Sequence, residues 1–315
     1  MNTVKPRILS IALFLVCGCL PAAAAALGTS ARSAIPAEAQ QIIVVDYRAF
    51  NDSATARSLK ERMTSPRLRQ FEAALRQTGI VPEKEVEQLT FASFRSQEQG
   101  LQLVGIAEGS FARETVVRNL RMKGIRPQRY RRAALYPMEG GMTMTFLDDS
   151  SLLFGEPAAV KLALAAHQGE IQSLNANAQI SDLMSGMEAG AIWSVLDAEG
   201  TGNMLRSALG QSSQLADYEG LRKRLRGSRY SVDLSRGLDF NLDVLTADSF
   251  TAATLSSLFQ AGVMLRKLKA TSAEKMALED LSVESDGDQL KLHFKSDEKR
   301  FQTLLKSDLF AAVSK

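Results

Sequence analysis

The clearest pattern along the chain runs from residue 237 to residue 268. Apolar and polar residues alternate from Leu238 to Val244, which predicts a strand with one buried and one wet face. Asp248 or Ser249 can then cap a helix. Apolar residues at helical spacing predict that this helix faces a core along one stripe, made of Leu255, Leu258, Phe259, Gly262, Leu265 and Leu268.

A similar order of elements occurs earlier in the chain. The Gly-Leu and Ser-Phe pairs at 237–238 and 249–250 recur at 100–101 and 110–111. In each half a predicted hairpin leads into a helix, and two more strands and a short helix follow. The sequence therefore predicts an α+β fold of two related halves, each an antiparallel sheet with helices packed on one face. Two unrelated α+β halves with common hairpins remain the alternative.

The length of 315 residues is compatible with two domains, since domains usually span roughly 100–200 residues. An expected strand at 41–47 opens the first half, and Tyr130 to Tyr136 reads as one further strand. The expected organisation is a signal peptide or membrane anchor at 1–26, an Ala- and Ser-rich tether at 27–40, a first α+β domain at 41–168, a polar linker at 169–179 and a second α+β domain at 180–315.

Residues 1–26 are typical of a secretory signal, because Lys5 and Arg7 precede an apolar run that ends in small residues. Two alternatives stay open: lipidation of Cys19, or retention of the segment as an anchor, since about 20 apolar residues cross a bilayer. Both cysteines of the chain, Cys17 and Cys19, lie in this segment. We expect an exported protein, periplasmic or associated with the envelope and with membrane tethering left open, whose processed chain has no disulfide.

The sequence offers little catalytic or metal-binding chemistry. Its two histidines, His167 and His293, have no second His or Cys at metal-ligand spacing. No Ser elbow or phosphate-binding Gly loop follows a predicted strand. Asp239, Asn241 and Asp243 share one strand face and read as a solvated surface rather than a calcium or carbohydrate site. We predict no catalytic residue, no cofactor and no metal ligand.

Two basic clusters stand out from this background. Arg222, Lys223, Arg224, Arg226 and Arg229 form one of them. The other spans residues 113–132 and contains a single acid, Glu114. From this second cluster we predict a surface for an anionic partner such as a lipid headgroup, with a solvated basic face as the alternative. Its residues are Arg118, Arg121, Lys123, Arg126, Arg129, Arg131 and Arg132.

Several short stretches resemble a group of uncharacterised bacterial secreted or envelope proteins. They are Thr90 to Arg95, Gly105 to Phe111, Tyr136 to Met138, Ile192 to Leu196 and Phe250 to Thr254. The resemblance implies an envelope location. It implies no activity and no residue roles.

The leading functional hypothesis is a non-catalytic envelope or periplasmic module for binding or scaffolding. A carrier of a hydrophobic ligand such as a lipid is the first alternative, and it requires a sizeable apolar cavity. A hydrolase with an unrecognised site is the second, and it requires converging polar side chains. The expected partner is an envelope protein or lipid, not nucleic acid, with the membrane contacted only through the N-terminal segment.

Overall fold

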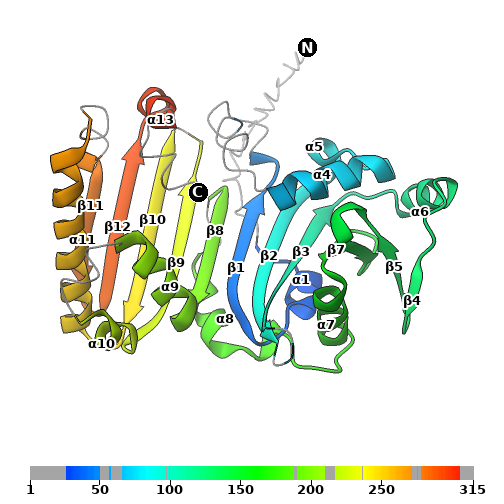
Figure 1. Ribbon diagram of the computed structural model, residues 1–315, viewed down its shortest axis with the longest axis horizontal. Coiled ribbons are helices and arrows are strands. Elements are labelled where there is room, and N and C mark those ends of the chain that lie inside the picture. Colours follow the sequence, from blue (N-terminus) through cyan, green and yellow to red (C-terminus); the bar gives the residue numbers. More distant parts are fainter. Residues whose placement is uncertain are drawn as a thin grey trace, which may run out of the picture.

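The computed structural model describes residues 26–49, 57, 66–96, 98, 100–187, 190–209, 217–235, 237–271, 275 and 278–305 (Figure 1). Its strands are β1 (Ala39–Asp46), β2 (Val86–Ser96), β3 (Gly100–Gly109), β4 (Gln128–Tyr130), β5 (Ala133–Pro137), β6 (Thr143–Phe146), β7 (Ser151–Gly155), β8 (Ile192–Asp197), β9 (Leu225–Asp233), β10 (Leu238–Thr246), β11 (Leu281–Asp286) and β12 (Gln289–Ser296). Its helices are α1 (Thr29–Ala34), α4 (Pro66–Thr78), α5 (Pro82–Glu85), α6 (Arg113–Met122), α7 (Pro157–His167), α8 (Ala178–Met184), α9 (Ala198–Leu209), α10 (Tyr218–Arg222), α11 (Ser249–Lys269) and α13 (Glu298–Leu305).

All of these strands belong to one antiparallel sheet of 12 strands, in the order β11-β12-β10-β9-β8-β1-β2-β3-β7-β6-β5-β4. The fold is α+β, as predicted. The two separate sheets expected from the sequence are joined, however, because β1 pairs with β8 and places Val44 opposite Trp193. Each of these strands would otherwise leave an unpaired edge. Figure 1 shows this junction in the middle of the molecule.

Helices cover both faces of the sheet in the first half, so the expected one-sided packing is wrong there. On β2, Ala92 packs in a core with α1, α7 and α8, whereas Leu89 packs in a second core with α4 and α6. These two residues are three positions apart, and alternate side chains of a strand point to opposite faces. The prediction of one-sided packing is wrong for this half because β2 carries apolar side chains on both of its faces.

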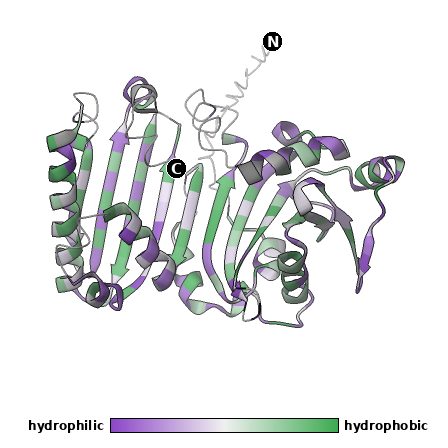
Figure 2. Cartoon of the chain, viewed as in Figure 1, coloured by the Kyte–Doolittle hydropathy of each residue, from purple (hydrophilic) through white to green (hydrophobic). Residues whose placement is uncertain are grey.

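Helices α9, α10 and α11 cover one face of the sheet in the second half. Leu205 of α9 and Leu255 of α11 pack there against Leu242 and Val244 of β10. The opposite side of β9, β10 and β12 carries charged and polar residues, and Figure 2 shows the resulting alternation of colours along these strands. Asp239 and Asp243 are part of that polar side, as the alternation from Leu238 to Val244 predicts.

Helix α11 begins at the predicted place but leaves the core halfway along its length. Asp248 is its N-cap, and the buried residues of the helix lie between Thr251 and Phe259. Leu265 and Leu268, expected to face a core, are 51% and 74% exposed. The reason is length, because the 21 residues of α11 span about 31 Å. The neighbouring β11 has 6 residues and spans about 20 Å.

The segments expected to be a tether and a linker are both folded, and they contact each other. Ala31 and Ala34 of α1 are fully buried, which corrects the reading of 27–40 as a tether. Leu174, within the expected linker 169–179, is also fully buried and donates its backbone N–H to the carbonyl of Ile35 at 2.7 Å. Small and apolar residues in both segments allow this close packing.

The stretch from 130 to 136, expected to be one strand, is instead a tight hairpin of β4 and β5. Arg131 lies at the turn with a φ of 53°, a left-handed conformation that an L residue rarely adopts. Ala133 pairs back onto Tyr130 across the turn. The hairpin puts Arg129 on one strand and Arg131 and Arg132 at the tip.

We predict that Ile42→Ala lowers the free energy of unfolding by about 2–5 kcal/mol, because Ile42 is fully buried in the core at the β1–β8 junction. Urea unfolding followed by far-UV circular dichroism and by the fluorescence of Trp193, the one tryptophan of the chain, measures this. Since Trp193 lies in the same core, both signals should change together. The exposed Arg48→Ala serves as control, with a change within about 0.5 kcal/mol. Two separate transitions would contradict the shared core.

Candidate functional site

The predicted anionic-partner residues gather at the end of the sheet that β4 forms. Figure 1 shows α6 and β4 at this end and α11 and β11 at the other. All of the residues are exposed. We call them the basic edge: Arg118 and Arg121 of α6, Lys123 at its C-cap, Arg126 in the following loop, Arg129 of β4, and Arg131 and Arg132 in the β4–β5 turn.

The charges of the basic edge are largely not neutralised by acids. Arg131 forms an ion pair with Glu170. Arg113, at the start of α6, lies 3.2 Å from Asp149. Among the described residues, Arg118 donates to the hydroxyl of Thr115 and Lys123 to the backbone carbonyl of Gln77, neither of which is an acid. Within the described residues, six cations of this edge have no ion pair: Arg118, Arg121, Lys123, Arg126, Arg129 and Arg132.

The second basic cluster has the opposite character, because four of its five cations are paired with acids. Arg229 lies 3.0 Å from Asp243, and Arg224 lies 2.9 Å from Asp248. Arg222 pairs with Glu219, and Arg226 with Asp288, at longer distances of 3.7 and 3.8 Å. This cluster therefore belongs to the internal electrostatics of the second half. This difference could not be predicted from the sequence, since three of these acids lie 14 or more residues from their partners.

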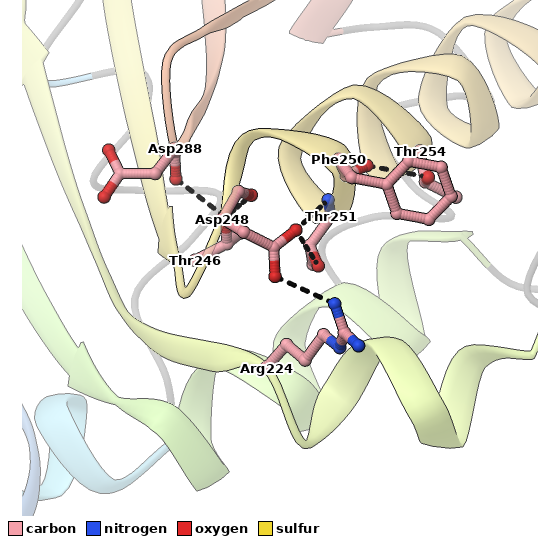
Figure 3. Close-up of polar contacts among 7 residues, drawn as sticks. All are labelled: Arg224, Thr246, Asp248, Phe250, Thr251, Thr254 and Asp288. Carbon is pink, nitrogen blue, oxygen red and sulfur yellow. Dashed lines mark hydrogen bonds and ion pairs between the residues drawn. The ribbon is translucent and has the colours of Figure 1, made fainter.

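Asp248 illustrates how the second cluster is used structurally (Figure 3). One carboxylate oxygen accepts from the backbone N–H of Thr251 at 2.8 Å and from its hydroxyl at 3.0 Å, and the other accepts from Arg224. The Thr251 N–H, the Thr251 hydroxyl and Arg224 together hold the pKa of Asp248 below its usual range. Arg224 therefore supports the cap of α11 rather than a ligand.

An exposed apolar side chain lies within the basic edge. Met122, the last residue of α6, is 72% exposed and follows Arg121 directly. Large apolar side chains surrounded by basic residues are typical of surfaces that contact anionic membranes. Arg118, one helical turn before Met122, places a further cation on the same helix.

Two clefts border the basic edge. One, of about 300 Å³, lies between α4, α6 and β5, and Glu139 is its one charged lining residue. The other, of about 340 Å³, lies where β5 separates from β6. Arg113, Arg132 and His167 line this second cleft, and no acid does. The sequence did not predict it, because the lining comes from α6, α7, β5 and β6.

A polar cluster fixes α1 beside this cleft. Ser33 of α1 lies 2.7 Å from Nδ1 of His167, and Ser30 donates to Asp148 at 2.5 Å. The backbone N–H of Gly28 donates to Glu108. Burial, together with the nearby charge of Asp148, raises the pKa of the Glu108 carboxyl despite that hydrogen bond. Glu108 and Asp148 both contact the N-terminal end of α1, where the helix dipole interacts favourably with negative charge.

The other residues singled out in the sequence do not converge on a site. His293 lies 3.4 Å from Asp239, which also pairs with Lys295, and Asn241 donates to Asp239. This side of the sheet is thus a network of cross-strand pairs. In the described part of the chain, no group of three or more His, Cys, Asp or Glu side chains could hold a metal ion.

The N-terminal segment 1–25, with Cys19, lies outside the described residues. Among those that are described, no helix has both the length and the apolar character needed to cross a bilayer.

By its fold, the chain is an α+β protein built on one antiparallel sheet with a basic edge. No protein-family model matches it, and no curated protein matches it significantly. One solved structure to which it is similar is titled "Structure of crystal form I of TP0453". The TM-score is 0.48 with 10% sequence identity, and the alignment covers 90% of this chain and 96% of that one. A similarity at this level carries no information about function.

We predict that Asp248→Ala lowers Tm at pH 7 and that Asp248→Asn lowers it less, because Asn also caps helices but cannot pair with Arg224. The folded-state pKa of Asp248 is lowered, so its stabilising effect is complete above the usual value of 3.8 and is lost as the pH falls through the lower folded-state value. Thermal melts from pH 7 to pH 2 should therefore show the two Tm values, wild type and Asp248→Asn, converging below pH 3.8. Arg121→Ala is the control and should leave Tm unchanged. A constant difference down to pH 2 would contradict the assignment.

Proposed function

We propose that this protein is a non-catalytic, exported envelope module whose basic edge binds an anionic lipid surface. One observation carries the proposal: six cations of the basic edge have no ion pair within the described residues, whereas the second basic cluster is paired with acids. Export rests on the basic and apolar pattern of residues 1–26. The proposal extends the expectation that only the N-terminal segment contacts the membrane.

The size of the electrostatic effect is sufficient for such a role. A Lys or Arg near an anionic membrane contributes about 1 kcal/mol, and the attraction decays within a Debye length of about 8 Å at physiological salt. Arg118, Arg121, Arg126 and Arg129 are all exposed. Because they have no acid partner in the described part of the chain, binding does not first require a salt bridge to break. Met122 adds apolar contact at the same surface.

We also propose that the two halves arose by duplication. Outward from the β1–β8 junction the strand order is β2, β3, β7, β6 on one side and β9, β10, β12, β11 on the other. Helices α6 and α11 follow the first hairpin of each half, and α7 and α13 follow the second. Strands β4 and β5 have no counterpart among the described residues between α11 and β11. Arg126, Arg129, Arg131 and Arg132 of the basic edge therefore lie where the halves differ, whereas Arg118, Arg121 and Lys123 lie on the shared helix α6.

Neither alternative function has comparable support. The two clefts described above are open to solvent and carry polar side chains, which does not favour a carrier of hydrophobic ligands. A hydrolase could use the contact between Ser33 and His167. However, a catalytic histidine is normally oriented by a third group, and no acid among the described residues forms a hydrogen bond or ion pair with His167.

The proposal predicts that a quadruple variant, with Gln in place of Arg118, Arg121, Arg126 and Arg129, loses affinity for anionic vesicles. Each cation near the membrane contributes about 1 kcal/mol, so the dissociation constant should rise at least tenfold. The measurement is cosedimentation of the full chain with vesicles containing phosphatidylglycerol, relative to vesicles of phosphatidylcholine alone. The N-terminal segment, with Lys5 and Arg7, is unchanged in the variant, so a difference from wild type reports on the basic edge.

A matched control replaces four other exposed arginines by Gln and so changes the net charge equally. These are Arg95, Arg206, Arg226 and Arg300, which pair with Glu199, Glu219, Asp288 and Asp280. The control should reduce vesicle binding less than threefold. Equal losses in the two variants would show that net charge, and not the basic edge, sets the affinity, and the proposal would then fail.

A further inference from the structure

The cleft of about 340 Å³ beside the basic edge exists because β5 and β6 separate. Their ladder contains two pairs, Tyr136 with Met144 and Pro137 with Thr143. Continued in the same register, it would pair Ala134 with Phe146, but both residues line the cleft instead. The opening is therefore a gap in the sheet between two strands. Residues of α6 and α7 complete its lining.

Two guanidinium groups line this gap without an acid among the lining residues. Arg132 makes no hydrogen bond and no ion pair with any described residue. Arg113 pairs only with Asp149, whose side chain is 92% exposed, and such exposed pairs contribute at most about 1 kcal/mol. The Arg113 guanidinium also lies 5.2 Å from the centre of the Phe146 ring, which limits its freedom. Both groups are available to an anion.

Helix α7 supplies two further polar side chains to the same lining. Nδ1 of His167 lies 2.7 Å from the hydroxyl of Ser33, a contact that fixes the orientation of the imidazole ring beside the cleft. Gln168, the next residue, lines the cleft and adds amide donors.

Apolar side chains complete the lining and limit the size of the ligand. Val117, Leu147 and Leu164 contribute from three elements, together with the ring of Tyr136. A volume of about 340 Å³ is at the lower end of the usual range of roughly 300–1,000 Å³ for small-molecule sites. It suits a phosphate group with a small attached moiety of about glycerol size.

We propose that this cleft binds the phosphate group of a small organic phosphate, either a lipid headgroup or a soluble ester, through Arg113 and Arg132. A planar guanidinium group can donate two parallel hydrogen bonds to two oxygens of one phosphate. This geometry makes the contact more specific than the long-range attraction of an exposed cation. The inference rests on the proposed function, since it names the group recognised at the lipid-binding edge.

The test is a calorimetric titration of the full chain with glycerol 3-phosphate and with dihexanoyl phosphatidylglycerol below its micelle concentration. Saturable binding to either is expected. Arg113→Gln and Arg132→Gln should each lower the affinity at least tenfold, because a hydrogen bond to a charged group contributes about 1.5–3 kcal/mol. Arg118→Gln removes the same charge on the basic edge outside the cleft lining and should change the affinity less than twofold.

A second variant, Ala134→Leu, fills the cleft without changing any charge. It should abolish binding of the small phosphates while thermal melts show a folded chain and binding to phosphatidylglycerol vesicles persists. Binding of glycerol 3-phosphate alone identifies a soluble phosphate ester as the ligand, and binding of the lipid alone identifies a headgroup. Both results support the site.

Absence of saturable binding to both ligands would overturn the inference, and so would equal losses in Arg118→Gln and Arg132→Gln. The proposed function fails under a different outcome, in which the quadruple variant of the basic edge and its control bind vesicles equally. If that happens while the small phosphates still bind saturably, the phosphate site is retained and the membrane role is rejected.

Discussion

The pairing of β1 with β8 is the interaction on which the rest of the structure depends. It joins two groups of strands into one sheet of 12 strands and buries Ile42, Val44, Trp193 and Val195 in a common core. Helices from both sides of the junction, α1 and α8, pack on this core. Because β1 and β8 each lose an edge in the pairing, the outer edges of the sheet lie at its two ends. The junction thereby fixes the basic edge at one end and α11 at the other.

The two ends differ in how their charges are balanced. In the second half, acids on β10, at the N-cap of α11 and in the β11–β12 turn pair with Arg229, Arg224 and Arg226. Glu219 of α10 pairs with Arg222. In the first half, α6 and the β4–β5 hairpin bring cations together at the outermost strands. Arg131 pairs there with Glu170, and Arg113 pairs with Asp149. Like charges gathered without partners cost stability, so a surface of this kind suggests a binding role.

The segment that follows the N-terminal residues is part of the core and of the cleft wall at once. Helix α1 is held by Glu108, Asp148 and His167, and through Ser33 it orients the ring of His167 beside the cleft. Gly28 permits this arrangement, because a Cβ there would lie 2.1 Å from a carboxylate oxygen of Glu108. Helix α1 therefore lies beside the proposed phosphate site, since Ser33 contacts His167 of the cleft lining.

Sequence alone determined the local elements: the alternating strand at Leu238, the cap at Asp248, the hairpins and the existence of a basic stretch at 113–132. These depend on side-chain periodicity and on contacts within a few residues. The tertiary structure decided that the strands form one sheet and that Leu265 and Leu268 lie outside the core. It also decided that the expected tether contains the packed helix Thr29–Ala34, and that Arg224 is paired whereas Arg121 has no ion pair among the described residues. Each of these depends on residues far apart in the chain, which meet only when the strand order is set, and no local pattern encodes that order.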